Sequence, residues 1–219
     1  MIRHTVRARA FAAALSALAG YIDAVGFLTL GGFFVSFMSG NSTRLGVAIA
    51  EGSPLAGIAL ALIAAFVAGV FAGFWLAHHS RPRTAQARVM ALVGLLLAGA
   101  ALLDHAGAPL AATFGATAAM GAVNAVFAPI GGFPVGLTYM TGTLVRIGQL
   151  LADATRGEDP LAWWPYLMHW AALVAGAVLG AWTQARIGLA ALWAASACAL
   201  ALAAVLVWST RAARSVRVD

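Results

Sequence analysis

The chain contains no lysine and few charged residues of either sign. Only 9% of its 219 residues are charged, whereas 63% are hydrophobic; a soluble domain has roughly 25% charged residues. This composition is therefore not that of a soluble domain. Long apolar runs, such as 55–77 and 89–103, predict an integral membrane protein that lies in the lipid bilayer.

The chain also lacks the patterns of common catalytic and metal sites. Its single cysteine, Cys198, excludes an intrachain disulfide. The histidines have no zinc-type spacing with a second ligand. Neither a Gly-x-Ser-x-Gly elbow nor a phosphate-loop lysine motif occurs. We therefore expect no enzyme activity, no metal and no cofactor.

All thirteen basic residues are arginines. Two of them, Arg44 and Arg146, lie inside apolar segments, and the others flank these segments or lie between them. This distribution indicates membrane orientation, because cytoplasmic loops carry an excess of basic residues. Nucleic-acid binding is not expected, since no soluble module presents a basic face.

The two halves of the chain are similar in sequence, which indicates duplication within a single transmembrane domain, 1–219. Repeat 1 covers about 10–104 and repeat 2 about 109–208. The matching blocks occur in the same order: GYIDAV at 20–25 with GAVNAV at 121–126, GGF at 31–33 with 131–133, MSGNSTRLG at 38–46 with MTGTLVRIG at 140–148, and AAFVAGVFAGFW at 64–75 with AALVAGAVLGAW at 171–182.

Each repeat has four apolar segments, and the second one, 34–50 or 134–152, is short and polar. If every segment crosses the membrane, seven of the eleven arginines outside the motifs share the side of the N-terminus. If the short segments enter and return, ten of the eleven do. The second topology fits the basic-residue rule better. It predicts an all-α polytopic bundle of two inverted repeats, with about six spanning helices, two short broken or re-entrant helices, and both termini in the cytoplasm.

The first short segment carries the candidate site. Gly40 and Arg44 are four residues apart and share one face of a helix. A half-helix that begins near Asn41 would direct free N–H groups into the core, where they favour an anion. Asp23 is the expected ion-pair partner of Arg44, because a buried charge needs a counter-ion.

The second repeat offers the matching set Asn124, Gly142, Thr143 and Arg146. Asn124 cannot neutralise Arg146, so the core would hold one excess positive charge. This excess favours an anionic substrate, or a purely structural role for one arginine. The predicted substrate-binding residues are Asp23, Gly40, Asn41, Arg44, Asn124, Gly142, Thr143 and Arg146.

Two pairs of small residues, Gly69/Gly73 and Gly176/Gly180, have the spacing that lets helix backbones approach closely. Packing within the chain is one interpretation. A homodimer through either pair is the other.

Residues 20–46, GYIDAVGFLTLGGFFVSFMSGNSTRLG, resemble the YoaK-type family of bacterial membrane proteins, which is defined by a domain of unknown function. The likeness rests on the aromatic-x-Asp-Ala pattern, the Gly-Gly pair and the Met-Ser/Thr-Gly-Asn-x-x-Arg signature. It implies a bacterial cytoplasmic-membrane protein of about six helices, with Asp23, Gly40, Asn41 and Arg44 as signature positions. The second repeat departs from the signature at Thr143.

These patterns favour a small-solute transporter whose central site lies at the interface of the repeats, and the excess positive charge favours an anion as its solute. A passive channel is the alternative within the same class. A membrane scaffold that transports nothing is the alternative outside it.

Overall fold

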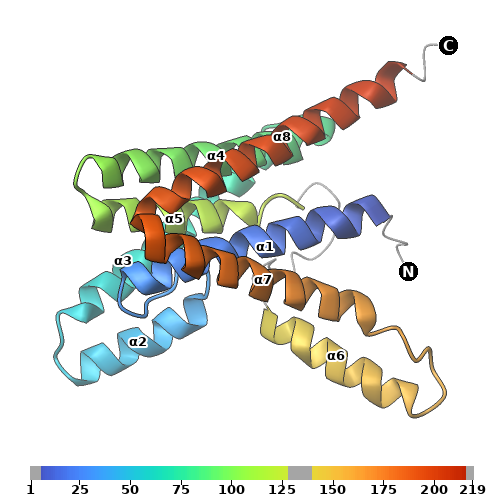
Figure 1. Ribbon diagram of the computed structural model, residues 1–219, viewed down its shortest axis with the longest axis horizontal. Helices are drawn as coiled ribbons and strands as arrows, with labels where there is room; N and C mark the ends of the chain where they lie inside the picture. The colour runs from blue at the N-terminus through green and yellow to red at the C-terminus, as the bar shows by residue number, and fades with distance from the viewer. Residues whose placement is uncertain (1–5, 128–139, 216–219) are drawn as a thin grey trace.

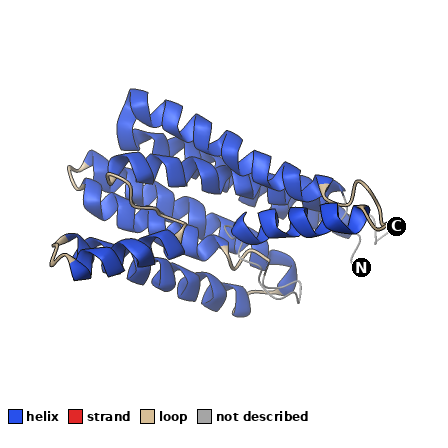
Figure 2. Cartoon of the chain, turned by 90° about the horizontal axis from the view of Figure 1, so that it is seen from below, coloured by secondary structure: helices blue, strands red, loops and turns tan. Residues whose placement is uncertain are grey.

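The computed structural model describes residues 6–127 and 140–215, and these residues form helices joined by short loops (Figures 1 and 2). The prediction of an all-α polytopic bundle is confirmed. In chain order the helices are α1 (Val6–Thr29), α2 (Met38–Ala50), α3 (Leu55–His78), α4 (Pro82–His105), α5 (Pro109–Val123), α6 (Met140–Ala154), α7 (Trp164–Ile187), the 3₁₀ turn η2 (Gly188–Ala191) and α8 (Leu192–Ser215).

Prolines mark where several of these helices begin. Pro82 and Pro109 open α4 and α5, and Pro165 lies in the first turn of α7. Proline fits there because its missing N–H belongs to the first turn, whose amide groups have no partner within the helix. No proline interrupts the later turns of these helices, so each of them continues without the kink that an internal proline imposes.

Four stretches of the described residues are long and apolar enough to cross a membrane: Ala10–Thr29, Leu55–His78, Pro82–His105 and Trp164–Thr210. The last stretch comprises α7 and α8, which run in opposite directions in Figure 1. The chain reverses between them at Gly188, whose φ of +59° suits glycine. The helix α5 is apolar but shorter, and its 15 residues extend about 22 Å.

The helices α2 and α6 are the shortest polar elements, as the sequence predicts. Their 13 and 15 residues extend about 20 and 22 Å, less than the roughly 30 Å of a bilayer core. The amino ends of both helices face the middle of the molecule, and their carboxyl ends point to opposite ends of the bundle (Figure 1). The predicted segment 34–50 becomes helical only at Met38, and the first part of segment 134–152 lies outside the described residues.

Glycines bring α3 and α5 into backbone contact. Gly69 lies against the backbone of Ala118, and Gly73 lies against the backbone of Ala122. A Cβ atom at either glycine would overlap these carbonyl groups. Because the residue numbers rise together along the interface, the two helices are parallel.

The same arrangement recurs between α7 and α1. Gly176 lies against the backbone of Ala17, and Gly180 lies against the backbone of Tyr21. By the sequence match of the halves, these four positions correspond to those of the α3–α5 contact. The third helix of each repeat therefore packs on the first helix of the other repeat. Both glycine faces are covered within the chain, as the intramolecular interpretation expects.

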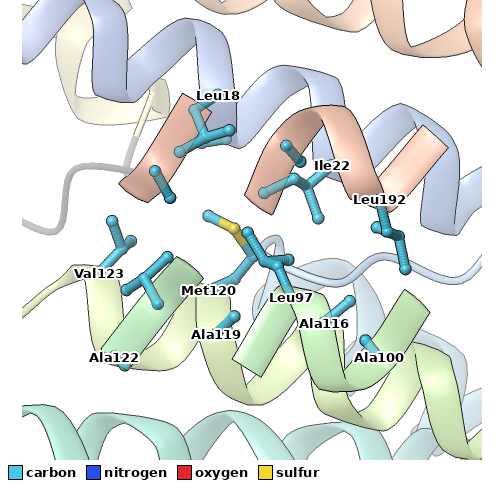
Figure 3. Close-up of a cluster of buried hydrophobic side chains, with 14 of the residues drawn as sticks. Leu18, Ile22, Leu97, Ala100, Ala116, Ala119, Met120, Ala122, Val123 and Leu192 are labelled. Carbon is cyan, nitrogen blue, oxygen red and sulfur yellow. The ribbon is translucent and has the colours of Figure 1, made fainter. Parts of the chain in front are cut away.

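The helices α4 and α8 form a third pair. The Ser196 hydroxyl donates to the Gly94 carbonyl at 2.8 Å, and the missing side chain of Gly94 leaves room for Leu200. The middle of the bundle, where α1, α4, α5 and α8 meet, is filled by apolar side chains (Figure 3). This core includes Leu18, Ile22, Leu97, Met120, Val123 and Leu192, all buried.

Candidate functional site

The loop between α1 and α2 is held by Asp23. Its Oδ1 atom accepts hydrogen bonds from the backbone N–H groups of Val35 and Ser36, both at 2.9 Å. Its Oδ2 atom accepts a bond from the Ser36 hydroxyl at 2.6 Å. Gly31 and Gly32, with φ of 62° and 103°, turn the chain so that these donors face the carboxylate. The role of Asp23 in this structure is therefore to fix the loop.

The buried side chain of Asn41 holds the same loop from α2. Its Nδ2 atom donates to the Phe34 carbonyl at 2.7 Å, and its Oδ1 atom accepts from the Phe34 N–H at 3.0 Å. The Asn41 amide thereby satisfies both the N–H and the carbonyl group of Phe34, which lies in a non-helical part of the backbone. At this depth such groups need an internal partner, since lipid offers none.

Gly40 provides space for aromatic rings. A Cβ atom there would lie 2.6 Å from the Phe37 ring and 3.1 Å from the Phe34 ring. These two rings pack edge to face, with centroids 5.2 Å apart. Aromatic side chains of the loop and of its junction with α2 therefore fill the space left by the missing side chain of Gly40.

The predicted ion pair between Asp23 and Arg44 is wrong. Asp23 is already occupied by three donors of the loop, which a sequence-based pairing of charges does not reveal. The Arg44 guanidinium instead lies over the ring of Phe33, with Cζ 5.0 Å from the centroid. Its Nη2 atom occupies the space left by the missing side chain of Gly32.

A hollow of about 200 Å³ lies beside Arg44 at the carboxyl end of α2. Glu51 directly follows α2 and keeps a near-helical backbone, so it lies about two turns beyond Arg44 on the same side of the helix. Glu51 was not among the predicted site residues, although this spacing from Arg44 could have identified it. The residues that line the hollow are Phe33, Thr43, Arg44, Val47, Ala48, Glu51, Ser53 and Leu55.

The second repeat is built differently. The Asn124 side chain donates to the carbonyls of Met120 and Gly121, at 3.0 and 3.2 Å. It thereby satisfies acceptors at the end of α5, which stops at Val123. The loop that would correspond to residues 34–36 lies outside the described residues.

In the described residues, the hollow beside Arg44 does not include Arg146. Arg146 is exposed on α6, and its Nη1 atom donates to Gln149 at 3.3 Å. Gly142 and Thr143 are half-buried on the same helix, but α6 contributes no residue to the hollow beside Arg44. Within the described residues, apolar side chains fill the middle of the bundle (Figure 3), so this part of the chain does not form the polar site predicted between the two halves.

Within residues 6–127 and 140–215, no group of three or more histidine, cysteine, aspartate or glutamate side chains could hold a metal ion. In this part of the chain the polar side chains that line the hollow are Arg44 itself, one glutamate and two hydroxyl residues. Such a set can bind a charged organic group through hydrogen bonds and ion pairing.

The long apolar helices and the buried polar loop define a multi-pass integral membrane protein. The chain belongs to the family described as "Protein of unknown function (DUF1275)", which matches residues 11–205. This confirms the predicted membership of an uncharacterised membrane family. The chain is also 40% identical over 196 residues to UPF0700 transmembrane protein RA0705 of Rhizobium meliloti (strain 1021), a match that covers 89% of this chain and 84% of that protein. No solved structure matches the chain.

Proposed function

We propose that the chain is a small-solute transporter whose solute site is the hollow beside Arg44. The observation that carries this proposal is the pair of short helices, α2 and α6, whose amino ends face the middle of the bundle from opposite ends (Figure 1). Interrupted helices of this kind form the binding sites of many secondary transporters. Irregular backbone at membrane depth persists where protein buries it or where it lines a water-filled cavity.

Inversion of the two repeats is part of the proposal. Corresponding helices run in opposite directions in Figure 1: α1 against α5, α3 against α7, and α4 against α8. The glycine contacts of α3 with α5 and of α7 with α1 are equivalent under the match of the halves. A two-fold axis in the membrane plane accounts for both facts, and two inverted units are the usual basis of alternating access.

The proposed orientation places both termini in the cytoplasm of a bacterial cell. The amino end of α1 and the carboxyl end of α8 lie at one end of the bundle, together with the loop that joins α6 to α7 (Figure 1). That loop carries Arg156, the turn between α3 and α4 carries Arg81, and Arg83 lies in the first turn of α4. The excess of arginine at this end fits the cytoplasmic side of the inner membrane.

A membrane scaffold is the second candidate. This function is favoured because Asp23 and Asn41 hold the loop between α1 and α2, and all their side-chain hydrogen bonds in the described structure are within the protein. A scaffold needs a rigid loop but no solute flux. A passive channel remains the alternative to a carrier, and kinetics separates the two.

The test is solute flux in proteoliposomes that contain the purified chain. A panel of labelled amino acids, carboxylates and amines is screened for saturable uptake, and counterflow then distinguishes a carrier from a channel. We expect Arg44→Gln to reduce uptake at least about tenfold, because a charge-assisted contact contributes roughly 1.5–3 kcal/mol. Arg156→Gln, in an exposed loop, is the control.

Uptake that is equal in the Arg44→Gln variant and in the unaltered protein would refute the Arg44 site. No flux of any solute across the panel, from protein that unfolds cooperatively, would favour the scaffold. Flux that saturates but shows no counterflow would favour the channel.

A further inference from the structure

We infer that the hollow beside Arg44 binds a small zwitterion, with its anionic group at Arg44 and its cationic group at Glu51. This inference rests on the proposed function only for the location of the site. It adds the class of ligand and a residue, Glu51, that lies outside the signature motif.

The first argument is that the Arg44 guanidinium is held in a fixed orientation. It is oriented by the Phe33 ring and by the space at Gly32, and in the described part of the chain it has no carboxylate partner. A half-buried guanidinium in this state is pre-oriented for an anion, and its planar fork suits a carboxylate or a phosphate group.

The second argument is the charge balance of the hollow. The lining contains one cation, Arg44, and one anion, Glu51. Their Cα atoms are about 10 Å apart along α2, because seven residues rise about 1.5 Å each. A ligand with a single negative charge would meet repulsion at Glu51, and one with a single positive charge would meet it at Arg44. A ligand that carries both charges, one at each end, satisfies both groups.

The third argument is what lies between the two charges. Val47 and Ala48 lie between Arg44 and Glu51 along the chain, and all four residues line the hollow together with Phe33 and Leu55. The wall between the two charges is apolar, so the ligand needs a short apolar link between its charged groups. At about 200 Å³ the hollow is smaller than the roughly 300–1,000 Å³ of pockets for drug-sized ligands, which limits the ligand to a small molecule.

Two sources could supply this chemistry: a free ω-amino carboxylate and the headgroup of phosphatidylethanolamine, whose phosphate and ammonium are also joined by a short link. Both place an anion and a cation on one short chain. The experiment therefore uses the full chain in nanodiscs of phosphatidylglycerol, with and without added phosphatidylethanolamine.

The probes are linear ω-amino carboxylates of increasing chain length, compared with carboxylates and amines of the same length. Binding is measured as the shift in thermal unfolding at millimolar probe. We expect at least one zwitterion to bind about tenfold to a hundredfold more tightly than either singly charged analogue. Competition by phosphatidylethanolamine would assign the same site to the lipid headgroup.

Two variants test which residue binds each charge of the ligand. The Glu51→Gln variant should bind the zwitterion and the carboxylate with equal affinity. The Arg44→Gln variant should bind the zwitterion and the amine with equal affinity. Glu158→Gln, in an exposed loop, should leave all affinities unchanged. Equal binding of carboxylate and zwitterion to the unaltered protein would overturn the inference, as would the absence of binding by every probe in both kinds of nanodisc.

The outcomes for ligand and for transport are separable. Zwitterion binding without flux in proteoliposomes would refute transport and leave the ligand assignment intact. Arg44-dependent flux of another solute, with no zwitterion bound, would refute the ligand assignment and leave transport intact.

Discussion

At the scale of single residues, the signature of the first repeat builds a loop. Asp23 and Asn41 satisfy backbone groups of Phe34, Val35 and Ser36 that no helix can satisfy. Arg44 is the one charged member of the signature left facing a hollow. The signature therefore combines residues that hold the loop with a residue available to a ligand.

The first prediction concerns Asp23. Asp23→Ala removes the acceptor of two backbone N–H groups and one hydroxyl, and each unsatisfied buried group costs roughly 1–3 kcal/mol. We expect the free energy of unfolding in detergent to fall by about 3 kcal/mol or more. Asp23→Asn keeps an acceptor oxygen, so it should lower this free energy by only about 1 kcal/mol.

Asp104→Ala is the matched control, because this half-buried carboxylate lies at the end of α4. A change there should stay within about 0.5 kcal/mol. If Asp23→Ala were as mild as Asp104→Ala, the loop would not depend on the Asp23 carboxylate.

At the scale of helices, the glycines determine which helices pack together. The sequence indicates that Gly69 and Gly73 allow a close approach, but it does not identify the partner helix. The structure shows that α3 packs on α5 and that α7 packs on α1, so each contact joins the two repeats. The spacing of glycines could not predict these pairings, because it describes one helix, whereas a contact also depends on the helix that packs against it.

The second prediction follows from these glycine contacts between helices. Gly69→Ala and Gly176→Ala each place a methyl group against a carbonyl of the facing helix, and backbone atoms cannot move aside as a side chain can. We expect each variant to lower the free energy of unfolding by about 1–3 kcal/mol.

Gly99→Ala is the control, since a Cβ at Gly99 in α4 meets nothing within 4 Å. It should be neutral, or stabilising by up to about 1 kcal/mol through helix propensity. Equal effects at Gly69 and Gly99 would show that the α3–α5 contact is not close-packed.

At the scale of the whole molecule, composition predicts the all-helical bundle that the structure shows. The helical segments and the two short polar helices follow from the sequence, because apolar length and polar interruptions determine what can cross lipid. The duplication and the topology drawn from arginine placement stay predictions. The site was predicted less well. Pairing Asp23 with Arg44 considered charge alone, whereas the backbone donors of Val35 and Ser36 compete for the same carboxylate.

The central claim is that α2 enters the membrane and returns on the side from which it came. The most direct test is cysteine labelling in spheroplasts with a membrane-impermeant maleimide, using Cys198→Ser as the background. We predict that Ser53→Cys and Ala106→Cys react in intact spheroplasts, whereas Ser80→Cys and Glu158→Cys react only after permeabilisation. Labelling of Ser80→Cys in intact spheroplasts, with Ser53→Cys protected, would mean that α2 crosses the membrane and would contradict the account.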